Sequence, residues 1–144
     1  MAGKSDFLEA LYLNLIFKSS TNSAWASAAG SATNIYVALY TADPTDAGAP
    51  TNNEAAYTGY ARVSKNRSTD WGVSGTSPTT VNPIANIDFG QCTASAGGPI
   101  THFALVDSAS GAGNILYAGT VSPNITMAVG VIPRLTTATA ITED

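Results

Sequence analysis

Residues 100–121 read ITHFALVDSASGAGNILYAGTV, two apolar-rich runs separated by a string of small residues. The runs extend from Ile100 to Asp107 and from Asn114 to Val121, and the sequence SASGAG between them has the composition of a turn. Apolar runs of this length on either side of a turn predict an antiparallel β-hairpin. The chain is therefore expected to contain an antiparallel sheet.

A second run, NIYVALY at residues 34–40, alternates with apolar side chains on both faces and predicts a central strand. Other strands are expected at 60–64, 84–89, 125–129, 131–135 and 136–142, with a hairpin around Gly130. Gly- and Pro-rich breaks separate these short runs. The pattern indicates a mainly β protein, an antiparallel β-sandwich or a jelly-roll-like barrel with one N-terminal α-helix.

The N-terminal part has a different period. Apolar residues repeat at helical spacing over residues 5–18, and Asp6 and Glu9 have the spacing of a capping box. Leu13 and Phe17 fall off the apolar stripe and face either their own loops or a neighbouring subunit. Residues 19–32 form a small-residue arm or loop around Trp25. We expect one domain over residues 1–144, with the sandwich at 33–144.

Composition limits the classes of function. Charged residues make up 11% of the chain, against roughly 25% in ordinary domains, and the net charge is −4. An acidic chain is a poor partner for nucleic acid, and no apolar run is long enough to cross a membrane. Cys92 has no second cysteine to pair with, which fits folding in a reducing compartment. A low-charge surface suits packing against other subunits.

The sequence offers little material for catalysis. His102 and Asp107 lie an odd number of residues apart on one expected strand and point to opposite faces, so no triad with Ser108 forms. Asp88 and Asp107 are better explained as turn and edge caps than as a carboxylate pair. Asp43 lies in a turn without the ligand spacing of a calcium loop. We expect no catalytic residues, no metal site and no cofactor.

The chain resembles a family of small tailed-bacteriophage virion proteins, commonly labelled tail fibre or capsid cement (decoration) proteins. The resemblance is carried by SDFLEALYLNLIF at residues 5–17, NIYVALYTADPTDAG at 34–48, GYARVS at 59–64 and THFALVDSASGAGNILYAGTVSP at 101–123. It implies a β-rich accessory protein of the virion without catalytic residues.

Two virion roles fit. Because the chain has neither heptads nor repeats from which to build a shaft, we expect a cement protein on the outer head surface, homo-oligomeric on the particle and bridging major capsid protein subunits. The alternative is a tail fibre or tail-tip protein that binds the host surface through exposed aromatic residues, namely Tyr57, Tyr60 or Trp71. The candidate interface residues are Leu13, Phe17, Trp25 and Trp71 as anchors and Arg62, Lys65 and Arg67 as polar partners.

Overall fold

The computed structural model describes residues 3–8, 34–67, 69–75 and 78–143. Within these ranges the chain is mainly β, as predicted, and residues 6–8 form a helical turn. The described strands are antiparallel and do not close into a barrel. In chain order they are β1 (Gly3–Lys4), β2 (Asn34–Tyr40), β3 (Val63–Asn66), β4 (Trp71–Ser74), β5 (Thr79–Pro83), β6 (Ile87–Asp88), β7 (Ile100–Val106), β8 (Ile115–Ile125), β9 (Arg134–Leu135) and β10 (Ile141–Glu143).

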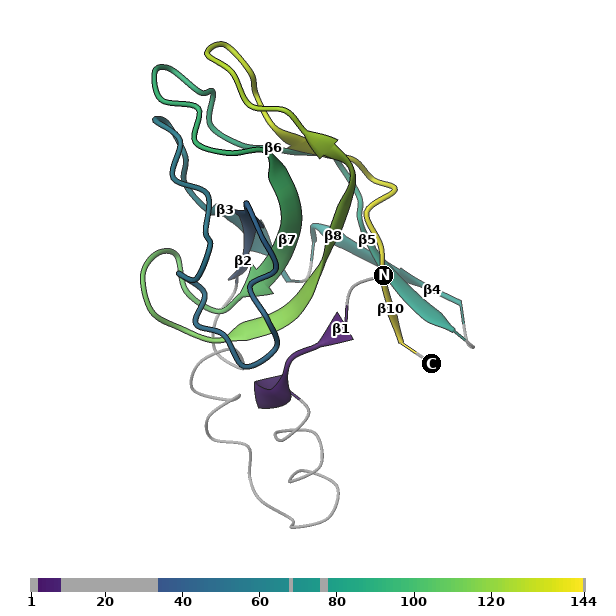
Figure 1. Cartoon of the computed structure of the whole chain (residues 1–144). Coiled ribbons are helices and arrows are strands. Elements are labelled where there is room, and N and C mark those ends of the chain that lie inside the picture. The colour runs from purple at the N-terminus through teal and green to yellow at the C-terminus, as the bar shows by residue number, and fades with distance from the viewer. Residues whose placement is uncertain (1–2, 9–33, 68, 76–77, 144) are drawn as a thin grey trace.

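The largest sheet has five strands in the order β1-β8-β7-β2-β3 (Figure 1). The predicted hairpin is present as β7 and β8, in which Ala104 pairs with Ala118. The predicted central strand is also confirmed, because β2 pairs with β7 on one side and with β3 on the other. Its alternation explains this position, since both of its faces are apolar and both become covered.

The two faces of the five-stranded sheet contribute to separate clusters of buried residues. Val37 and Leu39 of β2 belong to the larger cluster, whereas Ala38 and Tyr40 belong to a smaller one on the opposite face. The alternation of side chains along a strand produces this division. The larger cluster also contains residues from the other sheets, namely Ile87, Leu135 and Ile141.

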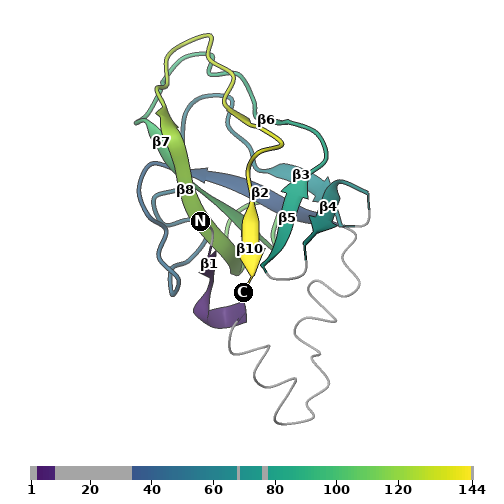
Figure 2. The same cartoon turned by 90° about the vertical axis from the view of Figure 1, so that its right-hand side faces the viewer.

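Two smaller sheets pack against the face that carries the larger cluster (Figure 2). One has three strands in the order β10-β5-β4, and the other has two, β6 and β9. The prediction of a hairpin around Gly130 is wrong, and the two-stranded sheet of β6 and β9 is found in its place. Gly130 does lie in a turn, with a φ of 93°, but Leu135 beyond it pairs with Ile87. Alternation marked these segments as extended, but it does not specify which segment is the partner.

Several strand boundaries differ from the predictions. The strand expected at 60–64 begins at Val63, and within the run 84–89 only residues 87 and 88 belong to a strand. The expected strand at 136–142 is shortened because Thr139 N–H donates to Thr136 O at 3.0 Å, closing a turn. Its last part forms β10.

Ser5, rather than Asp6, caps the helical turn. Its hydroxyl accepts a hydrogen bond from Leu8 N–H at 3.3 Å and donates to Ile115 O, and its backbone N–H donates to Leu116 O at 3.1 Å. These contacts attach the start of the helix to β8. The rest of the predicted helix and the arm at 19–32 lie outside the described residues. No helix in the described ranges is both long enough and apolar enough to span a membrane.

Candidate interaction surfaces

Arg62, in the segment before β3, forms a buried ion pair with Glu54 and hydrogen bonds to the β7–β8 turn. Arg62 is 8% exposed, and its Nε and Nη2 donate to the two carboxylate oxygens of Glu54 at 2.7 and 2.8 Å. Nη1 donates to Ser108 O and Oγ at 3.0 and 2.7 Å, and Nη2 also donates to Gly111 O at 2.9 Å. The hydrogen-bonded Glu54 carboxylate raises the pKa of Arg62. We call this group the Arg62 clamp.

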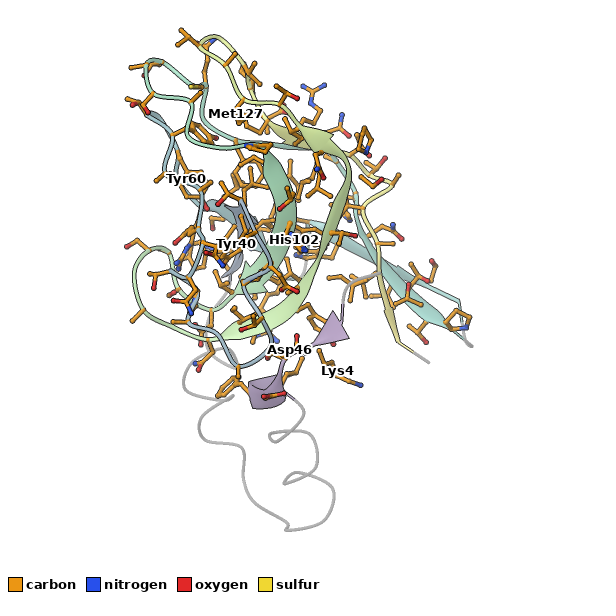
Figure 3. All side chains as sticks on the ribbon, in the orientation of Figure 1. Lys4, Tyr40, Asp46, Tyr60, His102 and Met127 are labelled. Carbon is orange, nitrogen blue, oxygen red and sulfur yellow. The ribbon has the colours of Figure 1, made fainter. Side chains whose placement is uncertain are left out.

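Three tyrosines are built into the same part of the structure. Tyr60 donates its hydroxyl hydrogen to Glu54 at 2.9 Å, and its oxygen accepts from Leu39 N–H at 3.1 Å. Tyr40 donates to a backbone carbonyl at 2.9 Å, and Tyr57 does the same at 2.9 Å. Burial raises the pKa of Tyr57 to about 12 and holds the pKa values of Tyr40 and Tyr60 well above the ordinary value. Figure 3 shows Tyr40 and Tyr60 in the body of the molecule.

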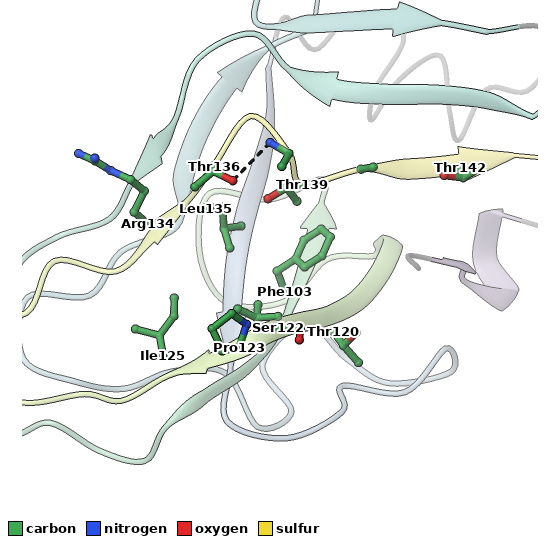
Figure 4. Close-up of a pocket in the computed structure, with 13 residues that line it drawn as sticks. Phe103, Thr120, Ser122, Pro123, Ile125, Arg134, Leu135, Thr136, Thr139 and Thr142 are labelled. Carbon is green, nitrogen blue, oxygen red and sulfur yellow. Dashed lines mark hydrogen bonds between the residues drawn. The ribbon is translucent and has the colours of Figure 1, made fainter.

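An open groove lies between the end of β8 and the segment 134–142 (Figure 4). Its volume is about 650 Å³, and Phe103 forms part of its wall. Hydroxyl groups come from Thr120, Ser122, Thr136, Thr139 and Thr142. Arg134 is the one charged residue among the described residues that line the groove. A lining of hydroxyl and apolar groups can hold an uncharged ligand by hydrogen bonds and packing, but it offers no acid–base pair for catalysis.

The acidic residues considered for chemistry each have a separate structural partner. Asp107 accepts hydrogen bonds from the backbone and side-chain amides of Asn114, both at 2.7 Å, and so stabilises the β7–β8 turn. Asp88 pairs with Arg134 at 2.5 and 2.9 Å, and this guanidinium lowers the pKa of Asp88. Asp43 caps a turn by accepting from Thr45 N–H at 2.9 Å. Within the described ranges, no three His, Cys, Asp or Glu residues are placed to hold a metal ion.

The candidate interface residues that the structure describes differ in their exposure. Arg62, expected to contact a partner, is instead buried in the clamp, because Glu54 and the β7–β8 turn supply acceptors for all of its nitrogens. Lys65 is half-buried on β3, and Arg67 is exposed. Trp71 packs against the core at the start of β4, with its Nε1 buried and without a hydrogen-bond acceptor. Leu13, Phe17 and Trp25 lie outside the described residues.

One expectation about exposed aromatic residues also fails, because Tyr57 is 3% exposed. Tyr60 is half-buried, with its hydroxyl donated to Glu54 and its ring stacked on Phe89. Among the described residues, the exposed large hydrophobic side chains are ones that the sequence reasoning missed: Val73, Ile84, Val129 and Ile132 are 69%, 63%, 65% and 52% exposed. For the last two, the available signal was the absence of charge from the whole run TMAVGVIP.

Residues 3–142 match a family described as "Podophage GP4 fiber I protein gp80". Among curated proteins, none matches significantly. The resemblance to phage virion proteins is thereby confirmed in its coarser form, and the fibre description fits better than cement. Because the match spans almost the whole chain, this protein belongs to the podophage GP4 fiber I protein family and is a structural protein of a bacteriophage virion.

Proposed function

We propose that the protein is a subunit of the fibre apparatus on the tail of a podophage. The observation that carries this proposal is the family match over residues 3–142. The structure is compatible with such a role, because the described body is held together by backbone hydrogen bonds between its loops and by buried apolar clusters. A rigid block of this kind can serve as a building unit.

This proposal replaces our preference for a cement protein. That preference depended on the absence of heptads and repeats, but such repeats are needed only in the shaft of a fibre. A globular subunit at a fibre's base, joint or end needs no shaft of its own. The low charge supports adhesion to other subunits, but it does not distinguish the head from the tail.

We further propose that the protein acts by contact alone, with other virion subunits as partners and without catalysis. Asp88 and Asp107, the carboxylates considered for chemistry, are engaged with Arg134 and Asn114. The groove beside β8 is lined by hydroxyl and apolar groups that favour binding over proton transfer.

The test is to locate the protein on purified virions. Gold-labelled antibodies against the chain are expected to mark the tail, and quantitative mass spectrometry is expected to find far fewer copies than of the major capsid protein. Antibodies against the capsid protein provide the control for labelling of the head. Label spread over the head, with copies in the hundreds, would reject the fibre proposal and favour cement.

A further inference from the structure

The groove beside β8 carries hydroxyl groups that the protein itself does not use. Among the described residues that line it, four have hydroxyls that make no hydrogen bond to another protein group: Thr120, Ser122, Thr139 and Thr142. We call these the groove hydroxyls. In Figure 4, Thr139 lies on the opposite wall from Thr120 and Ser122, with the ring of Phe103 between them. Each hydroxyl can both donate and accept hydrogen bonds, so the two walls offer donors and acceptors to a ligand.

The groove also has the size and the apolar surface of a small-ligand site. Its volume of about 650 Å³ lies within the range of roughly 300–1,000 Å³ that is usual for such sites. Four apolar side chains contribute to its lining, namely Phe103, Pro123, Ile125 and Leu135. A second hollow, of about 210 Å³ beside Ala96, lacks this combination, because the polar side chains of Thr41, Glu54 and Tyr57 that line it are all hydrogen-bonded within the protein.

We infer that the groove binds an uncharged saccharide. A sugar ring carries hydroxyl groups around its edge and C–H groups on its faces, so it can bond to the groove hydroxyls and cover the apolar lining at the same time. Arg134 is the one charged residue among the described residues of the lining, and its guanidinium is held by Asp88. An anionic sugar therefore gains no free cation here, and the net charge of −4 repels it.

Two other classes of ligand fit the groove less well. An extended peptide would bind as an added strand and needs a regular strand edge. Pro123 has no N–H to offer such a peptide, and the pairing of β8 with β7 is irregular between Thr120 and Ile125. A lipid tail would bury the groove hydroxyls without hydrogen-bond partners, which is unfavourable for each of them. A saccharide meets neither difficulty.

This inference goes beyond the place of the protein in the fibre apparatus and can fail separately from it, because binding is measured on the purified chain. The groove is open and leaves part of a ligand in water. A single site is therefore expected to bind an oligosaccharide with a Kd on the order of 1 mM. Several copies on one particle would bind a repeating polysaccharide far more tightly.

A glycan array tests for the ligand class. The full-length chain, carrying a flexible biotinylation tag, is tetramerised on streptavidin to offset the weak affinity of one site and is applied to neutral and anionic bacterial oligosaccharides. We expect signals from neutral oligosaccharides only. Absence of a signal from every neutral oligosaccharide, or equally strong signals from the anionic ones, would overturn the inference.

Two pairs of variants test whether the oligosaccharide lies in the groove. Saturation-transfer NMR with the array's strongest neutral oligosaccharide measures the Kd of the untagged chain. Thr139→Val keeps the side-chain shape but removes a groove hydroxyl, and should raise the Kd about fivefold. Ala138→Trp should fill the groove and abolish measurable binding. The matched controls are Thr137→Val and Thr137→Trp, because Thr137 is exposed in the same segment but does not line the groove. Binding unchanged in Thr139→Val and Ala138→Trp would overturn the inference.

Urea unfolding verifies that each variant is folded, and intact host cells identify the source of the saccharide. If the oligosaccharide displaces the chain from host cells, the site takes a saccharide of the cell surface. If the chain binds the oligosaccharide through the groove but does not bind cells, the saccharide belongs to another molecule, and the saccharide site itself is still supported.

Discussion

Removal of the Glu54 carboxylate is expected to destabilise the protein more than removal of any exposed charge. In Glu54→Ala, the Arg62 guanidinium stays buried at 8% exposure and loses its counter-ion, while its bonds to Ser108 and Gly111 cannot neutralise it. Breaking a buried ion pair from one side costs about 3–5 kcal/mol. Two charge-assisted hydrogen bonds, at roughly 1.5–3 kcal/mol each, give a similar figure.

The loss is large relative to the whole free energy of unfolding, which is about 5–15 kcal/mol for a typical domain. It corresponds to a fall in the unfolding temperature on the order of 10 °C. Urea unfolding followed by circular dichroism measures it directly. Asp88→Asn is the matched control, because it breaks an ion pair with Arg134 whose side chains are 47% and 54% exposed. The control should move the urea midpoint only slightly.

The double variant Glu54→Leu with Arg62→Met separates the effect of charge from that of shape. It removes both charges and keeps apolar volume, so it should recover much of the stability lost in Glu54→Ala. The reasoning is refuted if Glu54→Ala costs less than about 1 kcal/mol, the value of a solvent-exposed pair, or if the double variant is no more stable than the single one.

Three further predictions concern Tyr57, Gly90 and Cys92. Burial places the folded-state pKa of Tyr57 at about 12, above its ordinary value of 10.0. The stability that depends on the neutral phenol is therefore complete below pH 10 and is lost as the pH rises through about 12. Absorbance titration should show that ionisation of Tyr57 coincides with loss of structure. Gly90→Ala would place a Cβ 2.0 Å from Gly59 O and should cost about 1–3 kcal/mol, whereas Gly3→Ala, with nothing within 4 Å, should be neutral in the same urea assay. The Cys92 thiol should react with a chromogenic disulfide reagent only after unfolding, and rapid labelling of the folded chain would contradict its burial.

The sequence was informative where local patterns determine structure. The β7–β8 hairpin and the central position of β2 were predictable, because alternation and turn composition act over a few residues. The pairing of β6 with β9 was not, since it joins segments that are far apart in the chain and only two residues long. Short strands carry too little pattern to specify a partner.

The Arg62 clamp shows that local sequence also fails to identify the partners of a buried side chain. Arg62, Lys65 and Arg67 are three cations within six residues, all predicted to be polar partners of an interface, and nothing local distinguishes Arg62 from the other two. Arg62 is buried by Glu54, eight residues earlier, together with carbonyls of Ser108 and Gly111 in the β7–β8 turn, which lie 46 and 49 residues away in the chain. A prediction from neighbours in sequence could not identify them.

For a related reason, amino-acid composition could not decide whether the protein lies on the head or on the tail of the virion. Scarcity of charge and of reactive groups describes how a surface adheres, and both a decorated head and a fibre need adhesion. The physical question is which faces of the chain its neighbours occupy, and composition does not distinguish one face from another. A globular subunit that contacts its neighbours through its surface can be built into a larger assembly without any repeat in its sequence. The missing repeats therefore argue against a shaft but not against a fibre.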